Sequence, residues 1–204
     1  MTELAIYGGT FAPVHNGHVQ AVNAFLETVK PDRLLIIPTL IPPHKQIDFD
    51  DNPTDRLEML RLAFSSHPLY EKTVFISDYE LNSPPPSYTY NTLKNFSSND
   101  VHITFLCGTD MFLTLDSWYR ADDIFKMCTI ALMLRESKTP ELLEKIQSKQ
   151  HYLTEKYGAD IIVIDMPPVE ISSSEIRSGG DSIRKEYLPC PVYKYIKENG
   201  LYCS

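Results

Sequence analysis

The 204-residue sequence has no run of apolar residues near the roughly 18 that a membrane-spanning helix needs. Its first residues, Met1 to Tyr7, lack the basic stretch that opens a signal peptide, so we expect them to belong to the fold.

Basic residues are scarce: 19 Lys and Arg stand against 27 Asp and Glu, a net charge of −8. A general nucleic-acid-binding protein needs a basic face, so we do not expect nucleic acid as a partner. Because the long apolar run is missing, we do not expect a membrane partner either. A small anionic ligand stays open, because a few local donors can hold a phosphate on an acidic protein.

Cysteine is also rare, with only Cys107, Cys128, Cys190 and Cys203. Their spacing shows no CxxC and no Cys/His finger pattern, so we expect reduced, partly buried thiols in a cytoplasmic protein. Internal repeats and low-complexity tracts are absent, and the length suits one domain over residues 1–204. None of these features fixes the oligomeric state, and a homo-oligomer stays open.

What the chain does have is an alternation of short apolar runs and amphipathic stretches. Such runs, bounded by polar or turn residues, are typical of buried parallel strands. We predict strands at Leu4–Tyr7, Arg33–Pro38, Thr73–Ile76, His102–Cys107, Thr129–Leu134 and Asp160–Ile164. The alternation predicts an α/β fold, a doubly wound and mostly parallel sheet flanked by helices on both faces.

Several helices follow from capping residues and apolar spacing. The first is expected to begin with Asn16 as its N-cap, and the second to run from about Asp55 to Ser65. A short third helix should begin near Ser172, because Ser172 and Glu175 have the spacing of a capping box. The segment Pro189–Leu201 is predicted to be a closing amphipathic helix, ended by a glycine.

The segment Gly8–His18, GGTFAPVHNGH, joins the first predicted strand to the first helix. Glycine lets a backbone approach a phosphate closely, and a helix start offers unpaired N–H groups and the positive end of a dipole. His15 and His18 could donate hydrogen bonds to phosphate oxygens and stabilise charge on a leaving pyrophosphate. Gly17 between them adds no side chain that would block a ligand. Metal ligation and a plain surface location are the alternatives for these two histidines.

Gly8–His18 resembles the signature GGTFDPxHxGH of nicotinate-nucleotide adenylyltransferases. That family belongs to the HxGH nucleotidyltransferases, whose fold is Rossmann-like. The resemblance implies ATP binding through Gly8, Gly9, Thr10 and Phe11, with His15 and His18 as catalytic residues around the scissile bond. One position departs from the signature, because Ala12 stands where an Asp is usual.

Pro42-Pro43-His44-Lys45 resembles the family's PPHK loop and falls in a predicted loop over Thr39–Pro53. A lysine on a proline-stiffened loop can place a point charge on ATP phosphates. Lys45 is therefore a candidate catalytic and ATP-binding residue, and His44 a candidate acceptor-binding residue. The alternative is a solvated surface lysine.

Ser87–Leu93, SYTYNTL, resembles the family's SYTxxTL segment and follows a predicted loop over Asn82–Ser87. The resemblance implies that Thr89 hydrogen-bonds the acceptor nucleotide. From the residues alone, Ser87 or Thr89 could equally cap a helix.

Gly108-Thr109-Asp110 follows a predicted strand, at the end of the sheet where doubly wound folds bind ligands. With Trp118 and Tyr119 it resembles the family's GxD…W element. The resemblance implies that Asp110 contacts a nucleotide sugar or organises metal and phosphates. It also implies that Trp118 stacks on the acceptor's pyridine ring and that Tyr119 lies on the acceptor side. As an alternative, Trp118 could be an ordinary core residue.

Ile171–Arg177, ISSSEIR, resembles the family's ISSTxIR motif. A second helix start, the hydroxyls of Ser172, Ser173 and Ser174, and Arg177 one turn later would suit the β- and γ-phosphates of ATP. Arg177 is therefore a candidate catalytic and ATP-binding residue. The alternative is an ordinary capping box with a surface arginine.

Together, the resemblances imply an adenylyltransferase that moves AMP from ATP to nicotinate mononucleotide. The products would be nicotinate adenine dinucleotide and pyrophosphate, in NAD biosynthesis. Mg²⁺ is the expected cofactor, held mainly by ATP phosphates and water. Nicotinamide mononucleotide and phosphopantetheine are alternative acceptors. A non-catalytic nucleotide-binding regulatory domain is the alternative from another class, against which the intact His15, His18, Lys45 and Arg177 argue.

Overall fold

The computed structural model describes residues 1–43, 52–134, 137–169 and 171–202. Its centre is a six-stranded sheet of order β3-β2-β1-β4-β5-β6, and all five pairings of neighbouring strands are parallel. This is the strand order of a Rossmann fold. The predicted fold class, a Rossmann-like doubly wound sheet in a single domain, is confirmed. The strands are β1 (Thr2–Gly9), β2 (Arg33–Pro38), β3 (Val74–Ile76), β4 (Val101–Gly108), β5 (Cys128–Leu134) and β6 (Ile161–Asp165).

All six predicted strands are present, with each end within two residues of its predicted place. The helices between them are α1 (Asn16–Val29), α2 (Pro53–Phe64), α3 (Thr89–Phe96), α4 (Thr109–Thr114), α5 (Ala121–Met127) and α6 (Pro140–Tyr157). After β6 come α7 (Ser173–Ser178), α8 (Asp181–Tyr187) and α9 (Cys190–Glu198), and two 3₁₀ turns, η1 (Glu80–Asn82) and η2 (Leu115–Ser117), precede α3 and α5.

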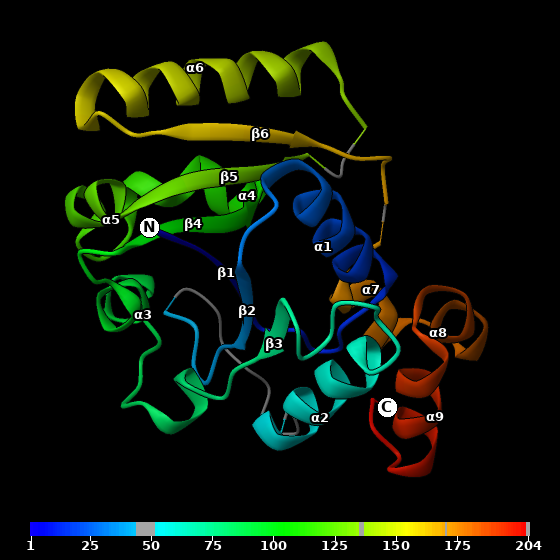
Figure 1. The fold of residues 1–204 in the computed structure, drawn as a ribbon. Coiled ribbons are helices and arrows are strands. Elements are labelled where there is room, and N and C mark those ends of the chain that lie inside the picture. The colour runs from blue at the N-terminus through cyan, green and yellow to red at the C-terminus, as the bar shows by residue number, and fades with distance from the viewer. Residues whose placement is uncertain (44–51, 135–136, 170, 203–204) are drawn as a thin grey trace.

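The helices form a layer on each side of the sheet. In Figure 1, α1, α2 and α7–α9 lie to the right of the sheet, and α3 and α5 lie to its left. The buried apolar residues fall into two clusters accordingly, one shared with α1, α2, α7 and α9 and the other with α3–α6. In β5, Ile130 and Leu132 belong to one cluster and Ala131 and Met133 to the other, because successive strand residues point to opposite faces.

The starts of α1 and α2 differ from their predictions. α1 does begin at Asn16, but its N-cap is His15. α2 begins at Pro53, ahead of the predicted start, because the Asn52 side chain accepts a hydrogen bond from the Thr54 backbone N–H at 2.9 Å. The predicted loop over Thr39–Pro53 is therefore wrong at its last residue. Asn82, at the start of the other predicted loop, ends η1.

Two helix predictions are confirmed. Ser172 caps α7 and exchanges hydrogen bonds with Glu175, as the capping-box spacing predicted. α9 ends at Glu198, and Gly200 just beyond it has a φ of 62°, the left-handed conformation that glycine adopts most easily.

Cys107, Cys128 and Cys190 are free thiols, and the first two are buried; Cys203 lies outside the described residues. Among the described helices, none combines the length and apolarity required to cross a bilayer.

Candidate active site

A cavity of about 1510 Å³ opens at the carboxyl ends of β1, β2, β4 and β5. Between β1 and β4 the strand order reverses, and that crevice is where open parallel sheets bind ligands. His44 and Lys45 lie outside the described residues. Every other predicted site residue lines this cavity: Gly8, Gly9, Thr10, Phe11, His15, His18, Thr89, Asp110, Trp118, Tyr119, Ser172, Ser173, Ser174 and Arg177.

The loop after β1 is shaped around the Phe11 side chain. Phe11 has a φ of 51°, which is uncommon for a residue with a side chain, and its ring is buried. The ring packs edge-to-face on Tyr7 and on His18, with centroid distances of 5.3 and 5.1 Å. A Cβ on Gly9 would lie 3.0 Å from that ring, so any larger residue here would require Phe11 to shift.

The two histidines of the first motif lie against each other at the start of α1. Their ring centroids are 3.8 Å apart, and His15 is buried while His18 is half-buried. The His15 backbone N–H donates to Nδ1 of His18 at 3.1 Å. Because Nδ1 accepts that hydrogen bond, a neutral His18 carries its proton on Nε2. His18 therefore has the tautomer of a donor through Nε2.

Gly17 is closely packed between His15 and Val169. A Cβ on Gly17 would lie 3.0 Å from the His15 ring and 3.1 Å from Val169. The glycine therefore makes room for the histidine. That it also leaves a ligand unobstructed stays a prediction.

The serine-rich motif is bonded directly to the first motif. Arg177 donates from Nη1 to the Ala12 carbonyl at 2.6 Å and from Nη2 to Ser174 Oγ at 3.2 Å. Ser173 Oγ donates to the Pro13 carbonyl at 2.9 Å. Arg177 is thus half-buried between the two motifs, and its interpretation as an ordinary surface arginine is wrong. The Ala12 contact uses the main chain, so the absent Asp side chain does not affect it.

On the opposite wall, the SYT segment packs on the segment containing Tyr119. The rings of Tyr88 and Tyr119 are 4.6 Å apart at their centroids and tilted by 35°. Thr89 is the first residue of α3, and Tyr88 is its N-cap. The interpretation of Ser87 or Thr89 as the cap is therefore wrong: Ser87 Oγ instead accepts the Leu40 backbone N–H at 3.2 Å.

Trp118 is half-buried and belongs both to the core edge and to the cavity wall. Its ring meets Phe105 edge-to-face at 6.3 Å, and Nε1 donates to Thr114 Oγ1 at 3.3 Å. Asp110 lies in the first turn of α4, directly after β4, and is exposed at the cavity. Both residues come from the side of the sheet opposite α1.

Glu80 is a cavity residue that the sequence did not reveal. Its carboxylate accepts the Thr92 hydroxyl at 2.6 Å, and both residues line the cavity. Burial raises the pKa of Glu80, and hydrogen bonds from Thr92, Thr39 and Ser87 offset part of that rise. Nothing in the sequence separates this glutamate from the other acids. Its burial depends on hydroxyl groups that come from other segments.

No three or more His, Cys, Asp or Glu side chains are grouped to hold a metal ion within residues 1–43, 52–134, 137–169 and 171–202. The role of Mg²⁺ stays a prediction.

The chain is similar to known proteins over nearly its whole length. Residues 6–179 match the family described as cytidylyltransferase-like. A protein of Caldicellulosiruptor saccharolyticus named "Probable nicotinate-nucleotide adenylyltransferase" is 38% identical, over 98% of this chain and 98% of its own length. A protein of the same name from Clostridium botulinum type A3 is 35% identical, over 99% of this chain and 100% of its own. The chain belongs to the nicotinate-nucleotide adenylyltransferase family.

Solved structures support the same fold. The Plasmodium falciparum nicotinic acid mononucleotide adenylyltransferase complexed with NaAD has a TM-score of 0.76 at 19% identity, with 99% of this chain and 98% of that one covered. At that identity, the likeness establishes the fold alone.

Proposed function

We propose that this protein transfers AMP from ATP to nicotinate mononucleotide, forming nicotinate adenine dinucleotide and pyrophosphate. The observation that carries this proposal is the meeting of both sets of motif residues in one cavity. His18 and Arg177 lie on the side predicted to hold ATP, and Thr89 and Trp118 on the side predicted to hold the acceptor. Full-length relatives that carry this family's name support it.

The reaction needs no protein nucleophile. An oxygen of the acceptor's phosphate attacks the α-phosphorus of ATP, a new P–O bond forms, and the bond to the β-phosphate bridge breaks. Pyrophosphate leaves with the electron pair of that bond. The protein's contribution is to align the two reactants and to stabilise the charge that moves onto the leaving group.

The residues of the first motif suit that task. A His18 protonated on Nε2 can donate to a phosphate oxygen, and His15 lies against it. The first turn of α1 holds no acidic residue, so the positive end of the helix dipole is not offset there. We assign Lys45 and Arg177 to the β- and γ-phosphates.

Mg²⁺ would accompany ATP as its counter-ion. The exposed carboxylate of Asp110 offers the oxygen ligand that this ion prefers, directly or through water. The ion would supply charge neutralisation on the triphosphate. The absence of nucleic acid as a partner and the cytoplasmic location both stay predictions.

The acceptor wall favours a planar aromatic substrate. Trp118, Tyr88 and Tyr119 put aromatic rings around one part of the cavity, and a cationic pyridine ring gains from an aromatic face. Phosphopantetheine has no such ring. The choice between nicotinate and nicotinamide depends on contacts to one substituent of that ring.

Pyrophosphate release tests the proposal. The purified protein would receive ATP and Mg²⁺ with nicotinate mononucleotide, nicotinamide mononucleotide or phosphopantetheine in parallel. We expect the fastest release with nicotinate mononucleotide. A preference for another acceptor would overturn the acceptor and keep the reaction. ATP binding without release from any acceptor would support a non-catalytic nucleotide-binding domain.

A further inference from the structure

Arg56, in the first turns of α2, is the largest side chain that is fully buried in the described part of the chain. Arginine stays charged in proteins, and burying a charge is unfavourable unless hydrogen bonds replace its water. Three of these bonds go to main-chain carbonyls. Nη1 donates to Thr10 at 2.8 Å and to Thr39 at 2.7 Å, and Nη2 donates to Leu40 at 3.4 Å.

Those carbonyls belong to two loops that leave adjacent strands. β1 and β2 are paired up to Gly9 and Pro38, and the last bond runs from the Thr39 N–H to the Gly9 carbonyl at 2.9 Å. Thr10 lies just past that point on one strand, and Leu40 on the other. Arg56 therefore joins the loops that follow β1 and β2, at the point where the hydrogen bonds between the two strands end.

Each loop continues to a different wall of the cavity. Thr10 leads into the segment that ends in His15 and His18, on the ATP side.

The loop after β2 is bonded to Ser87. The Leu40 N–H donates to Ser87 Oγ at 3.2 Å, and the Ser87 N–H donates to the Ile41 carbonyl at 2.9 Å. Ser87 directly precedes Tyr88 and Thr89 on the acceptor side.

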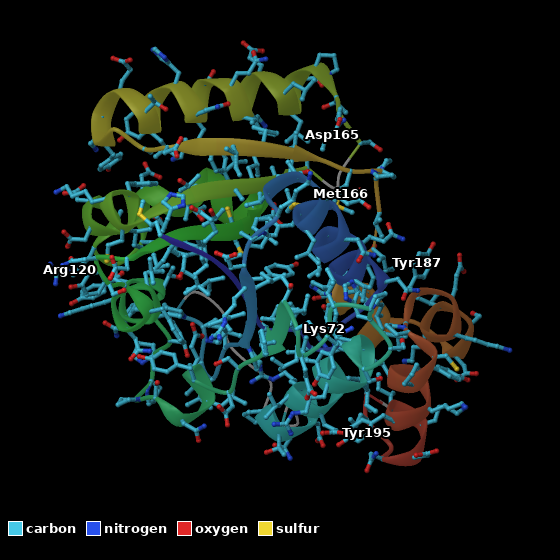
Figure 2. All side chains as sticks on the ribbon, in the orientation of Figure 1. Lys72, Arg120, Asp165, Met166, Tyr187 and Tyr195 are labelled. Atoms are coloured by element: carbon cyan, nitrogen blue, oxygen red, sulfur yellow. The ribbon has the colours of Figure 1, made fainter. Side chains whose placement is uncertain are left out.

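The start of α2 gives Arg56 a fixed origin. Asn52 caps the helix, and Asp55 accepts the Tyr195 hydroxyl of α9 at 2.8 Å. Figure 2 shows Tyr195 on α9, beside α2. The guanidinium thus projects from an anchored helix end, and its planar fork can serve two loops at once.

We propose that Arg56 is a positioning residue for adenylyl transfer, which sets the ATP-side loop against the acceptor-side loop through the carbonyls of Thr10, Thr39 and Leu40. This inference rests on the proposed function. Arg56 itself is fully buried and does not line the cavity. Its effect is on the alignment of the attacking phosphate with the α-phosphorus, and a misplacement of about 1 Å can cost about 100-fold in rate.

The test compares three variants in the acceptor assay, below their unfolding temperatures. Arg56→Met removes the donors, and Arg56→Lys keeps the charge without the fork. Leu60→Ala, also fully buried in α2, is the control for lost stability. For Arg56→Met we expect kcat to fall about 10- to 100-fold, with KM for ATP and for the acceptor each within about 3-fold of wild type. The kcat of Arg56→Lys should lie between those of Arg56→Met and wild type, and Leu60→Ala should keep a near-normal kcat.

Several outcomes would overturn the inference: an unchanged kcat in Arg56→Met, a rise in one KM alone, or an equal loss of kcat in Leu60→Ala. If Arg56→Met does not fold, Arg56→Lys decides, since a kcat equal to that of Leu60→Ala would contradict the proposal. The wild-type protein in the same assay distinguishes a failure of the proposed function from a failure of the positioning role. An inactive wild type would contradict the proposed function, whereas an active wild type with indifferent Arg56 variants would contradict the positioning role only.

Discussion

Arg177 donates a hydrogen bond of 2.6 Å to the main-chain carbonyl of Ala12, 165 residues earlier in the chain. A second bond, from Ser173 to the Pro13 carbonyl, runs beside it. The two motifs assigned to ATP are thus held together by hydrogen bonds to main-chain carbonyls. The guanidinium has five N–H donors, so a phosphate can share it with Ala12 and Ser174.

Replacing Arg177 should mainly weaken ATP binding. In Arg177→Met, loss of a charged donor, worth about 1.5–3 kcal/mol, should raise KM for ATP by about 10-fold or more. Arg61, exposed on α2 and paired with Glu58, provides the control Arg61→Met, which should leave KM for ATP unchanged. Steady-state kinetics at saturating acceptor measure both. An unchanged KM for ATP in Arg177→Met would remove Arg177 from the phosphate site.

His18 should matter for the chemical step. His18→Ala removes a donor aimed at charge that develops in the transition state, so turnover should fall by about 100-fold or more. His151, exposed on α6, provides the control His151→Ala, which should keep normal turnover. Near-normal turnover in His18→Ala would contradict the assignment of His18 as a catalytic residue.

Trp118 should matter for the acceptor and not for ATP. A ring over a cationic pyridine contributes about 0.5–2 kcal/mol, so Trp118→Ala should raise KM for nicotinate mononucleotide by about 2- to 30-fold. Trp118→Phe keeps an aromatic face and should lose less. Thermal unfolding should accompany the kinetics, because Trp118 also packs on Phe105. A rise in KM for ATP of the same size would contradict the acceptor role.

Glu80 should make stability depend on pH. Its pKa is raised by burial, so the folded state keeps a proton at pH values where the unfolded chain, with a value near 4.5, has lost it. The contribution of Glu80 to the free energy of unfolding of the wild type therefore falls as pH rises from 4.5 to the pKa of Glu80 in the folded state. Glu80→Gln cannot titrate, and its amide oxygen can still accept the Thr92 hydroxyl.

The free energy of unfolding of Glu80→Gln, minus that of wild type, should therefore increase as pH rises through this window and then level off. Urea unfolding at several pH values between 4 and 8 measures it. Glu198→Gln, at an exposed glutamate in α9, provides the matched control for the removal of one carboxyl group. A flat or declining difference for Glu80→Gln would contradict the assigned burial effect.

The sequence was most informative where the physics is local. Buried strands such as β2 show as short apolar runs, and the capping box of Ser172 and Glu175 can be read from its spacing. The first motif, Asp110 and the serine motif follow strands or begin helices, whereas Trp118 and Tyr119 were expected in the site only through the family resemblance. The cap of α2 was missed because Asn52-Pro53, itself a good helix start, was assigned to a loop.

Arg56 and Glu80 could not have been predicted in this way. Arg56 is bonded to carbonyls 46 and 17 residues away, and such main-chain partners leave no trace in side-chain patterns. Within the apparent amphipathic helix of α2, it resembles any polar residue of the exposed face. Glu80 likewise owes its burial to Thr92, which comes from a different helix.

The central claim is that AMP is the group transferred, and a position-specific label tests it most directly. With ATP labelled at the α-phosphate and nicotinate mononucleotide as acceptor, the label should appear in the adenine dinucleotide, at a rate equal to pyrophosphate release. With ATP labelled at the γ-phosphate, the label should leave in pyrophosphate. Transfer of the γ-label to the acceptor, or release of the α-label as free AMP, would contradict adenylyl transfer.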